Sequence, residues 1–230
     1  IHAFCAHLLR ERPVEAEIAP GFTELDEEAD AAFRRQAWRD YLDRERATGS
    51  PVYRELSEVG VQPKDLDDAF ATVCRFAEVE FPTGDGPVPD ARPAQAGLQD
   101  FWARLGRLLP DPIADDTTCG VQQRVRDFQG RLQIADLTRP AALGELLGMW
   151  ETTPKIVQKW WHPDPKQKKA AAGQVQELLA RFQEETVVPF LAAWRQYVYR
   201  LAMTLICGGR DFAARARAWR ASSRLVSSKT

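Results

Sequence analysis

The sequence predicts an all-α protein, an irregular bundle of several helices with one long, kinked helix near its C-terminus. Apolar residues recur at the three- and four-residue spacings of amphipathic helices, and no set of segments alternates as strands do. The chain has 230 residues, of which 44% are hydrophobic and 28% charged. This composition is typical of a soluble globular protein that can bury a sizeable core.

Two helices are expected in the first 47 residues. Residues 2–12 carry one apolar face, which Pro13 ends because proline cannot continue a helix. Thr23 and Asp26 can both cap the next helix, and acidic residues in its first turn suit the positive end of the helix dipole. The predicted buried stripe of this second helix consists of Phe33, Ala37, Tyr41 and, beside them, Trp38.

Shorter helices and a loop are expected in residues 50–93. Ser50 and Pro51 predict the start of a helix, and Gly60 predicts its end. Residues 81–93 read FPTGDGPVPDARP, and their four prolines and two glycines predict a loop or hinge. The helix between these two segments is marked by Leu66, Phe70, Val73 and Ala77.

Three further helices are expected between residues 98 and 147. Each shows one apolar stripe at helical spacing. The stripes are Leu98, Phe101, Leu105 and Leu108, then Val121, Val125, Phe128 and Leu132, and then Leu143 and Leu147 after Thr138 and Pro140.

The longest helix is expected over residues 164–207, closed by Gly208 and Gly209. Pro189 should kink it, because the proline nitrogen donates no hydrogen bond and the ring displaces the carbonyl of Glu185. A separate final helix is expected after the two glycines.

Cysteine spacing and charge limit the chemistry of the chain. The four cysteines lie far apart, without the paired spacings of metal or redox sites, so we expect reduced thiols and no metal site. The net charge of −2 conceals an asymmetry, because residues 1–118 carry 13 Lys/Arg against 24 Asp/Glu and residues 119–230 carry 18 against 9. Either the charges are solvated helix faces that attract one another, or one side of the molecule faces a polyanion.

The motifs of common enzymes are missing from the sequence. It has no phosphate-binding G-x-x-x-x-G-K-[ST] loop, no G-x-S-x-G, no H-E-x-x-H and no dinucleotide fingerprint. We therefore expect no catalytic residue and no bound cofactor in this chain. No apolar run reaches the roughly 18 residues of a membrane span, and residues 1–9 are too short and polar for a signal peptide, which favours a cytoplasmic location without membrane contact.

Residues 153–169, TPKIVQKWWHPDPKQKK, suggest a nucleic-acid ligand. Lysines neutralise phosphates and aromatic rings stack on bases, a combination typical of single-strand and junction binders. Alternatively, the tryptophans hold an irregular segment in the core while the lysines stay in water. A basic stripe in the last helix, Arg217, Arg220 and Arg224, allows the same two interpretations. The candidate DNA-binding residues of the segment are Lys155, Lys159, Trp160, Trp161, Lys166, Lys168 and Lys169.

The opening stretch IHAFCAHLLRERPVEAEIAPGF, residues 1–22, resembles a known motif. It is similar to the Thr-x-His segment, followed by LLRERPVEAG and PGF, of UvrD-like superfamily 1 DNA helicases of the RecB and AddA type, the ATP-dependent exonuclease motors. His2 and Phe4 match the motif, whose threonine would lie just before Ile1. Because this element contacts single-stranded DNA in the family, the resemblance adds both residues to the DNA-binding candidates.

The resemblance also implies a division of the chain and a parent protein. Residues 1–21 would be a remnant of motor subdomain 1A, residues 22–225 the helical 1B subdomain, and residues 226–230 a tail. Both ends are then expected to be cut from a longer chain that supplies the ATP-binding loop and the Asp-Glu pair. The implied parent binds ATP and Mg²⁺, hydrolyses ATP while moving on DNA, and acts in DNA repair or recombination with a nuclease domain or subunit.

Within that parent, the fragment would be non-catalytic and would contact single-stranded, forked or duplex DNA, together with the remaining motor domains. A different hypothesis is a helical interaction module, whose basic half docks on the motor domains or on a partner subunit. A third, an independent enzyme, requires turnover of ATP or DNA by these 230 residues alone.

Overall fold

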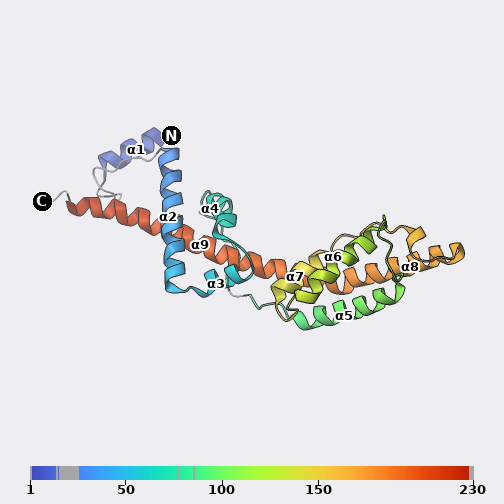
Figure 1. Cartoon of the computed structure of the whole chain (residues 1–230). Coiled ribbons are helices and arrows are strands. Elements are labelled where there is room, and N and C mark those ends of the chain that lie inside the picture. The colour runs from blue at the N-terminus through green and yellow to red at the C-terminus, as the bar shows by residue number, and fades with distance from the viewer. Residues whose placement is uncertain (1, 14, 16–25, 77, 85, 228–230) are drawn as a thin grey trace. The chain divides into compact units, whose positions relative to one another are not determined.

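A computed structural model describes residues 2–13, 15, 26–76, 78–84 and 86–227, with side chains between His7 and Ala218 (Figure 1). It confirms the all-α class, since every regular element in the described ranges is helical. None of these helices is both long and apolar enough to cross a membrane. In chain order the elements are α1 (His2–Glu11), α2 (Glu27–Thr48), α3 (Pro51–Glu58), η1 (Pro63–Leu66), α4 (Asp67–Val73), α5 (Ala91–Leu108), α6 (Gly120–Ile134), α7 (Pro140–Gly148), η2 (Gln158–Trp160), α8 (Pro165–Phe182), η3 (Gln183–Val187) and α9 (Val188–Ser227).

The helices form two compact units. The first unit consists of residues 1–85 and 200–230, and the second of residues 86–199. One junction falls in residues 81–93, which the sequence predicts as a loop or hinge. α5 already begins at Ala91, so the last three of these residues are helical. The other junction falls inside α9, so this helix supplies side chains to both units.

Capping side chains start several helices where the sequence predicts them. Asp26 accepts a hydrogen bond of 2.7 Å from the backbone N–H of Ala29 and begins α2, whereas Thr23 lies outside the described residues. Asp164 likewise accepts from the N–H of Lys166 and begins α8. These bonds satisfy N–H groups that the first turn of a helix leaves without a partner.

The prediction that Gly208 and Gly209 end the long helix is wrong, because α9 continues through both residues. A Cβ atom on Gly209 would lie 2.5 Å from the ring of Trp38, and one on Gly208 would collide with the hydroxyl group of Tyr41. The glycines therefore allow α9 to lie directly against two aromatic side chains of α2. Their role is close helix packing and not helix termination.

Trp38 is the centre of the first unit. Its side chain is only 3% exposed, its ring stacks on Phe70 at 4.5 Å between centroids, and its Nε1–H donates to Asp67 Oδ1 at 2.8 Å. The predicted stripe of α2 is thus shifted, because Trp38 and Ala37 are buried while the other two members are only partly covered. From the next predicted stripe Leu66, Phe70 and Val73 are buried, and Ala77 lies outside the described residues.

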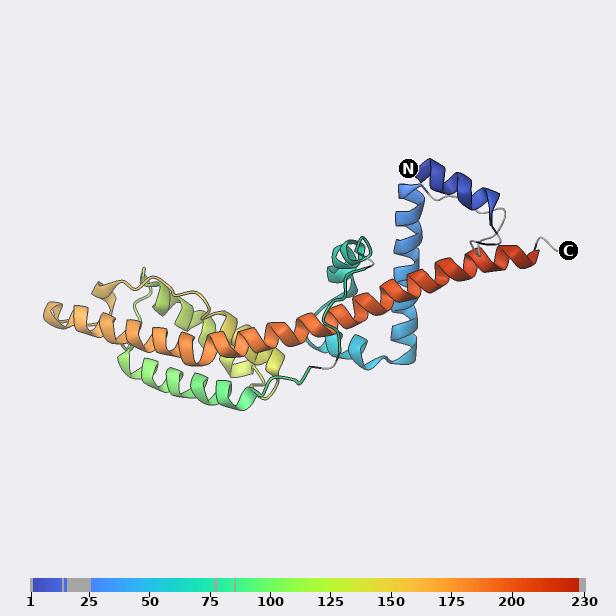
Figure 2. The ribbon, with the colours of Figure 1, turned by 180° about the vertical axis from the view of Figure 1, so that it is seen from behind.

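The irregularity expected at Pro189 takes the form of a π-helical turn. Over Gln183–Val187 the backbone is π-helical, and the N–H of Val188 donates to the carbonyl of Gln183, five residues earlier. Such turns accommodate a residue that cannot continue the regular hydrogen-bond ladder. α8 consequently runs on into α9, as the unbroken ribbon in Figures 1 and 2 shows.

Aromatic rings form the core of the second unit. Phe101 stacks on Phe182 at 4.0 Å between centroids, and Trp150 meets both Phe101 and Phe128 edge-on. Edge-on and offset arrangements are the favourable ones for aromatic pairs. The predicted stripes of the helices between residues 98 and 147 are confirmed, with Leu108 and Leu132 partly covered and the remaining members buried.

The role of Gly209 leads to a testable prediction. Gly209→Ala should lower the free energy of unfolding by about 1–3 kcal/mol, because the new methyl group forces Trp38 to move. Gly106→Ala in α5 is the matched control, since nothing lies within 4 Å of its Cβ position and the change should stabilise the helix by about 0.5–1 kcal/mol. Urea unfolding followed by circular dichroism measures both, and stabilisation by Gly209→Ala would contradict the packing role.

Candidate nucleic-acid interface

The lysine segment, residues 153–169, lies in the second unit and runs from the stretch after α7, through η2, into the first turns of α8. It holds five of the seven lysines of the chain and a single acid, Asp164. Lys168 is half-buried, and the other four lysines are exposed. None of the five forms an ion pair with any side chain that the structure describes.

The start of α6 holds the lysine segment in place. The N–H of Gly120 donates to the carbonyl of Lys155 at 2.8 Å, and Gln122 Nε2 donates to the carbonyl of Trp160, also at 2.8 Å. A Cβ atom on Gly120 would lie 3.0 Å from the backbone nitrogen of Lys155, so the small residue permits this approach. The backbone is therefore fixed at both ends of residues 155–160.

Gln122 can hold the segment because all of its buried polar atoms have partners. The side chain is 0% exposed, and its Oε1 accepts a 2.6 Å hydrogen bond from the hydroxyl of Thr117. That hydroxyl oxygen in turn accepts from the N–H of Cys119. Sequence reasoning missed Thr117 and Gln122, although a glutamine beside Val121 within an apolar stripe is a signal of a buried polar contact.

The two tryptophans of the segment are not equivalent. Trp161 belongs to the core and is only 3% exposed, so no base can stack on it in this structure. Trp160 is half-buried, donates from Nε1 to Thr118 Oγ1 at 3.1 Å, and has Lys159 Nζ 4.5 Å from its ring centroid. These contacts favour the interpretation in which tryptophans hold the segment in place, and they leave lysine charge as its main exposed feature.

The first turns of α8 add to this charge. Lys166, Lys168 and Lys169 follow the Asp164 cap directly, and Pro165 occupies the first helical position. Because the N-terminus of a helix carries a partial positive charge, the lysines and the backbone act in the same direction. The segment can therefore bind phosphate groups electrostatically.

The arginine stripe of the last helix is placed differently. Arg217 forms an ion pair with Asp30 of α2, and its guanidinium lies 5.6 Å from the ring centroid of Phe33. Its charge is thus already used inside the first unit, where Arg34 also pairs with Asp30. The side chains of Arg220, Arg224, His2 and Phe4 lie outside those that the structure describes. Of the arginine stripe, Arg217 alone has a described side chain, and it packs within the first unit.

Arginines in the second unit are mostly engaged, in contrast to the lysines. Arg195 makes two hydrogen bonds of 2.6 Å to Glu151, which lower the pKa of that carboxyl group below its ordinary value. Further pairs join Arg92 to Asp90, Arg104 to Asp100, Arg126 to Asp115 and Arg181 to Glu185. In the described part of this unit, the cations without a carboxylate partner are the five lysines of the segment and Arg107, Arg124, Arg131 and Arg139.

The hydrogen bonds of Gln122 lead to a second prediction. Gln122→Leu leaves the carbonyl of Trp160 without its donor and the hydroxyl hydrogen of Thr117 without its acceptor, at about 1–3 kcal/mol for each buried group. Residues 155–160 should then open more often, and trypsin should cut after Lys155 and Lys159 about tenfold faster. The control is Gln129→Leu on an exposed position of the same helix, and equal cleavage of both variants would contradict the assigned role of Gln122.

Comparison of the chain with protein-family models, curated proteins and solved structures found no match. Any function therefore has to be argued from the lysine segment and from the resemblance in residues 1–22.

Proposed function

We propose that the chain is a non-catalytic helical part of an ATP-dependent DNA helicase or exonuclease, and that the lysine segment contacts the DNA backbone. The observation that carries the proposal is a set of five lysines without carboxylate partners in the described residues, two on a stretch held by α6 and three in the first turns of α8. A rigid site binds more tightly than a mobile one, because less conformational entropy is lost on binding. The resemblance of residues 1–22 names the class of parent protein.

Phosphate contact is the mode of binding that these contacts favour. Lysines attract phosphates as point charges and need no defined base geometry. Base stacking is disfavoured, because Trp161 is buried and Lys159 lies over the ring of Trp160. We therefore propose sequence-independent binding, in which duplex and single-stranded DNA are both ligands.

The parent would supply the chemistry. ATP and Mg²⁺ would bind to its motor domains, and a nuclease domain or partner subunit would cut the DNA. His2 and Phe4 keep their proposed role as DNA contacts next to the motor. The proposed location is the cytoplasm.

A third prediction tests the lysine segment. The triple variant Lys159→Glu, Lys166→Glu, Lys169→Glu should bind a fluorescent duplex at least about tenfold more weakly, because repulsion replaces three phosphate contacts. The slope of log affinity against log salt is expected to be about −4.5 for five contacts, and it should become shallower by about three units in the variant. Fluorescence anisotropy between about 50 and 200 mM salt measures both quantities.

A charge-matched control separates local contact from overall charge. The triple variant Arg107→Glu, Arg131→Glu, Arg139→Glu alters exposed arginines of the same unit and changes the net charge equally. It should weaken binding far less. Equal losses in both variants would remove the lysine segment as the DNA site, and would favour instead its use in docking on an acidic protein surface.

A fourth prediction distinguishes phosphate contact from stacking. Trp160→Ala should change single-strand affinity by less than about threefold, because its ring is already covered. Loss of a base–aromatic stack would instead cost about 1–3 kcal/mol, or roughly five- to 150-fold in affinity. Anisotropy with single-stranded and duplex DNA of equal length measures the effect, and a large loss confined to the single strand would show that stacking dominates.

A further inference from the structure

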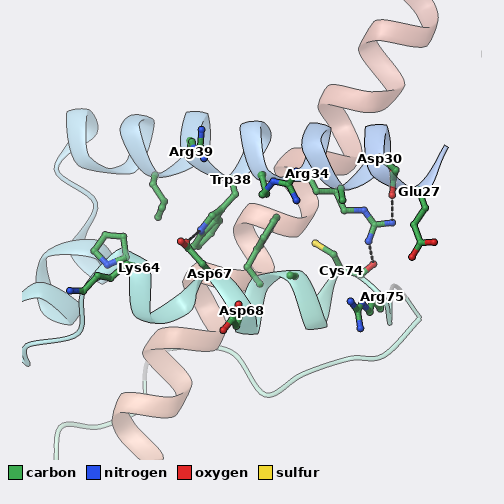
Figure 3. A pocket seen from close by; sticks show the side chains of 16 residues that line it. Glu27, Asp30, Arg34, Trp38, Arg39, Lys64, Asp67, Asp68, Cys74 and Arg75 are labelled. Atoms are coloured by element: carbon green, nitrogen blue, oxygen red, sulfur yellow. Dashed lines mark hydrogen bonds and ion pairs between the residues drawn. The ribbon is translucent and has the colours of Figure 1, made fainter. Parts of the chain in front are cut away.

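A groove of about 750 Å³ lies in the first unit between α2 and the η1–α4 segment (Figure 3). The residues of α2 that line it, from Glu27 to Leu42, are alternately three and one positions apart. This spacing places them on one face of the helix over about four turns. At 1.5 Å per residue this wall is about 22 Å long. The facing wall runs from Pro63 to Arg75 with similar spacing. The site is thus an elongated trough and not a compact pocket.

Two hydrogen bonds hold the walls at a fixed separation. Trp38 Nε1 donates to Asp67 Oδ1 at 2.8 Å, and Arg34 Nη1 donates to the carbonyl of Cys74 at 2.8 Å (Figure 3). Residue numbers increase along α2 while those of their partners decrease, so the two walls run antiparallel. The trough therefore exists before any ligand binds, as most binding sites do.

The apolar and charged parts of the lining suit one kind of ligand. Apolar lining comes from both walls, including Ala31, Leu42 and Ala71. Four cations also line the groove, and none of them is ion-paired with a side chain in the described part of the chain: Arg35, Arg39, Lys64 and Arg75.

The carboxylates of the groove only partly offset these cations. Asp30 is held by Arg34 and Arg217, and Asp67 accepts the indole hydrogen of Trp38. Glu27 and Asp68 remain without a side-chain partner in the described residues. Because Asp67 keeps its charge when it accepts from a neutral donor, five cations and four carboxylates line the groove, which leaves one surplus positive charge beside an apolar surface.

We propose that this groove binds a short amphipathic helix of a partner protein, with an apolar face and acidic flanks. Two antiparallel helices leave between them a trough into which the side chains of a third helix fit at the i, i+3, i+4 and i+7 positions. The four cations select acidic flanks by charge complementarity. The proposal concerns a different unit from the lysine segment and does not depend on DNA binding.

A pair of synthetic peptides tests this inference. Each has about 14 residues, enough for four turns, with leucine at the i, i+3, i+4 and i+7 positions. One carries glutamate at the remaining positions and the other carries lysine. Anisotropy with the full chain should show saturable binding of the acidic peptide, and at least about tenfold weaker binding of the basic one. No binding of the acidic peptide, or equal binding of both, overturns the proposal.

Matched variants locate the binding. Ala71→Trp fills the groove and should weaken binding of the acidic peptide at least about tenfold. Ala69→Trp changes an exposed position of α4 outside the groove and should leave this binding unchanged. The Lys159, Lys166 and Lys169 triple variant should bind the acidic peptide as the original chain does. If that triple variant no longer binds the acidic peptide, the peptide binds to the lysine segment and not to the groove.

A measurement on the unaltered chain gives a result even if Ala71→Trp fails to fold. Cys74 lines the groove as a free, half-buried thiol. Saturation with the acidic peptide should slow its alkylation by iodoacetamide at least about fivefold, as burial of a binding-site thiol would. Mass spectrometry of the Cys74-containing fragment distinguishes it from the other cysteines. If the peptide binds and the rate at which iodoacetamide alkylates Cys74 stays the same, the proposal is overturned.

Discussion

Close approach of helices at glycine is the constraint on which both compact units depend. In the first unit, Gly209 of α9 leaves room for Trp38, which reaches Phe70 and Asp67 behind it. In the second unit, Gly97 of α5 faces Thr186 of the π-helical turn, whose Cγ2 would lie 2.8 Å from an added Cβ. Because interiors are packed as densely as crystals, even one methyl group at such a contact displaces a whole side chain. The cost of glycine in a helix is offset by the packing that it permits.

A buried polar side chain, Gln122, fixes the backbone of part of the exposed lysine segment. Gln122 costs free energy to bury, yet the hydroxyl of Thr117 and the carbonyl of Trp160 satisfy both ends of its amide. The result is an irregular stretch with a defined backbone, on which the lysines project into water. A binding surface made of flexible side chains on a fixed backbone suits a ligand of regular charge and variable sequence, such as the DNA backbone.

The two cation types divide the electrostatic roles of the chain. Several described arginines pair with carboxylates of their own unit, as Arg217 does with Asp30. Two groups of cations without carboxylate partners have different surroundings, one in the lysine segment and one in the groove between α2 and α4. The first presents mainly lysine charge, which suits phosphates, whereas the second combines charge with apolar walls, which suits a protein helix. The two proposed sites thus use different residues in different units.

Local spacing in the sequence determined the all-α class, the caps at Asp26 and Asp164, the loop before α5 and the clustering of lysines. These features follow from backbone preferences and from contacts between residues three or four positions apart, and both can be read directly from the sequence. Only the tertiary structure decided that Trp38 packs against Gly209 and that Arg217 forms an ion pair with Asp30. It also decided that Trp161 is buried while Trp160 is half-buried. It also created the groove, whose walls lie far apart in the chain. Each of these depends on contacts between remote segments, and spacing along a chain carries no information about which remote side chain will fill a given space.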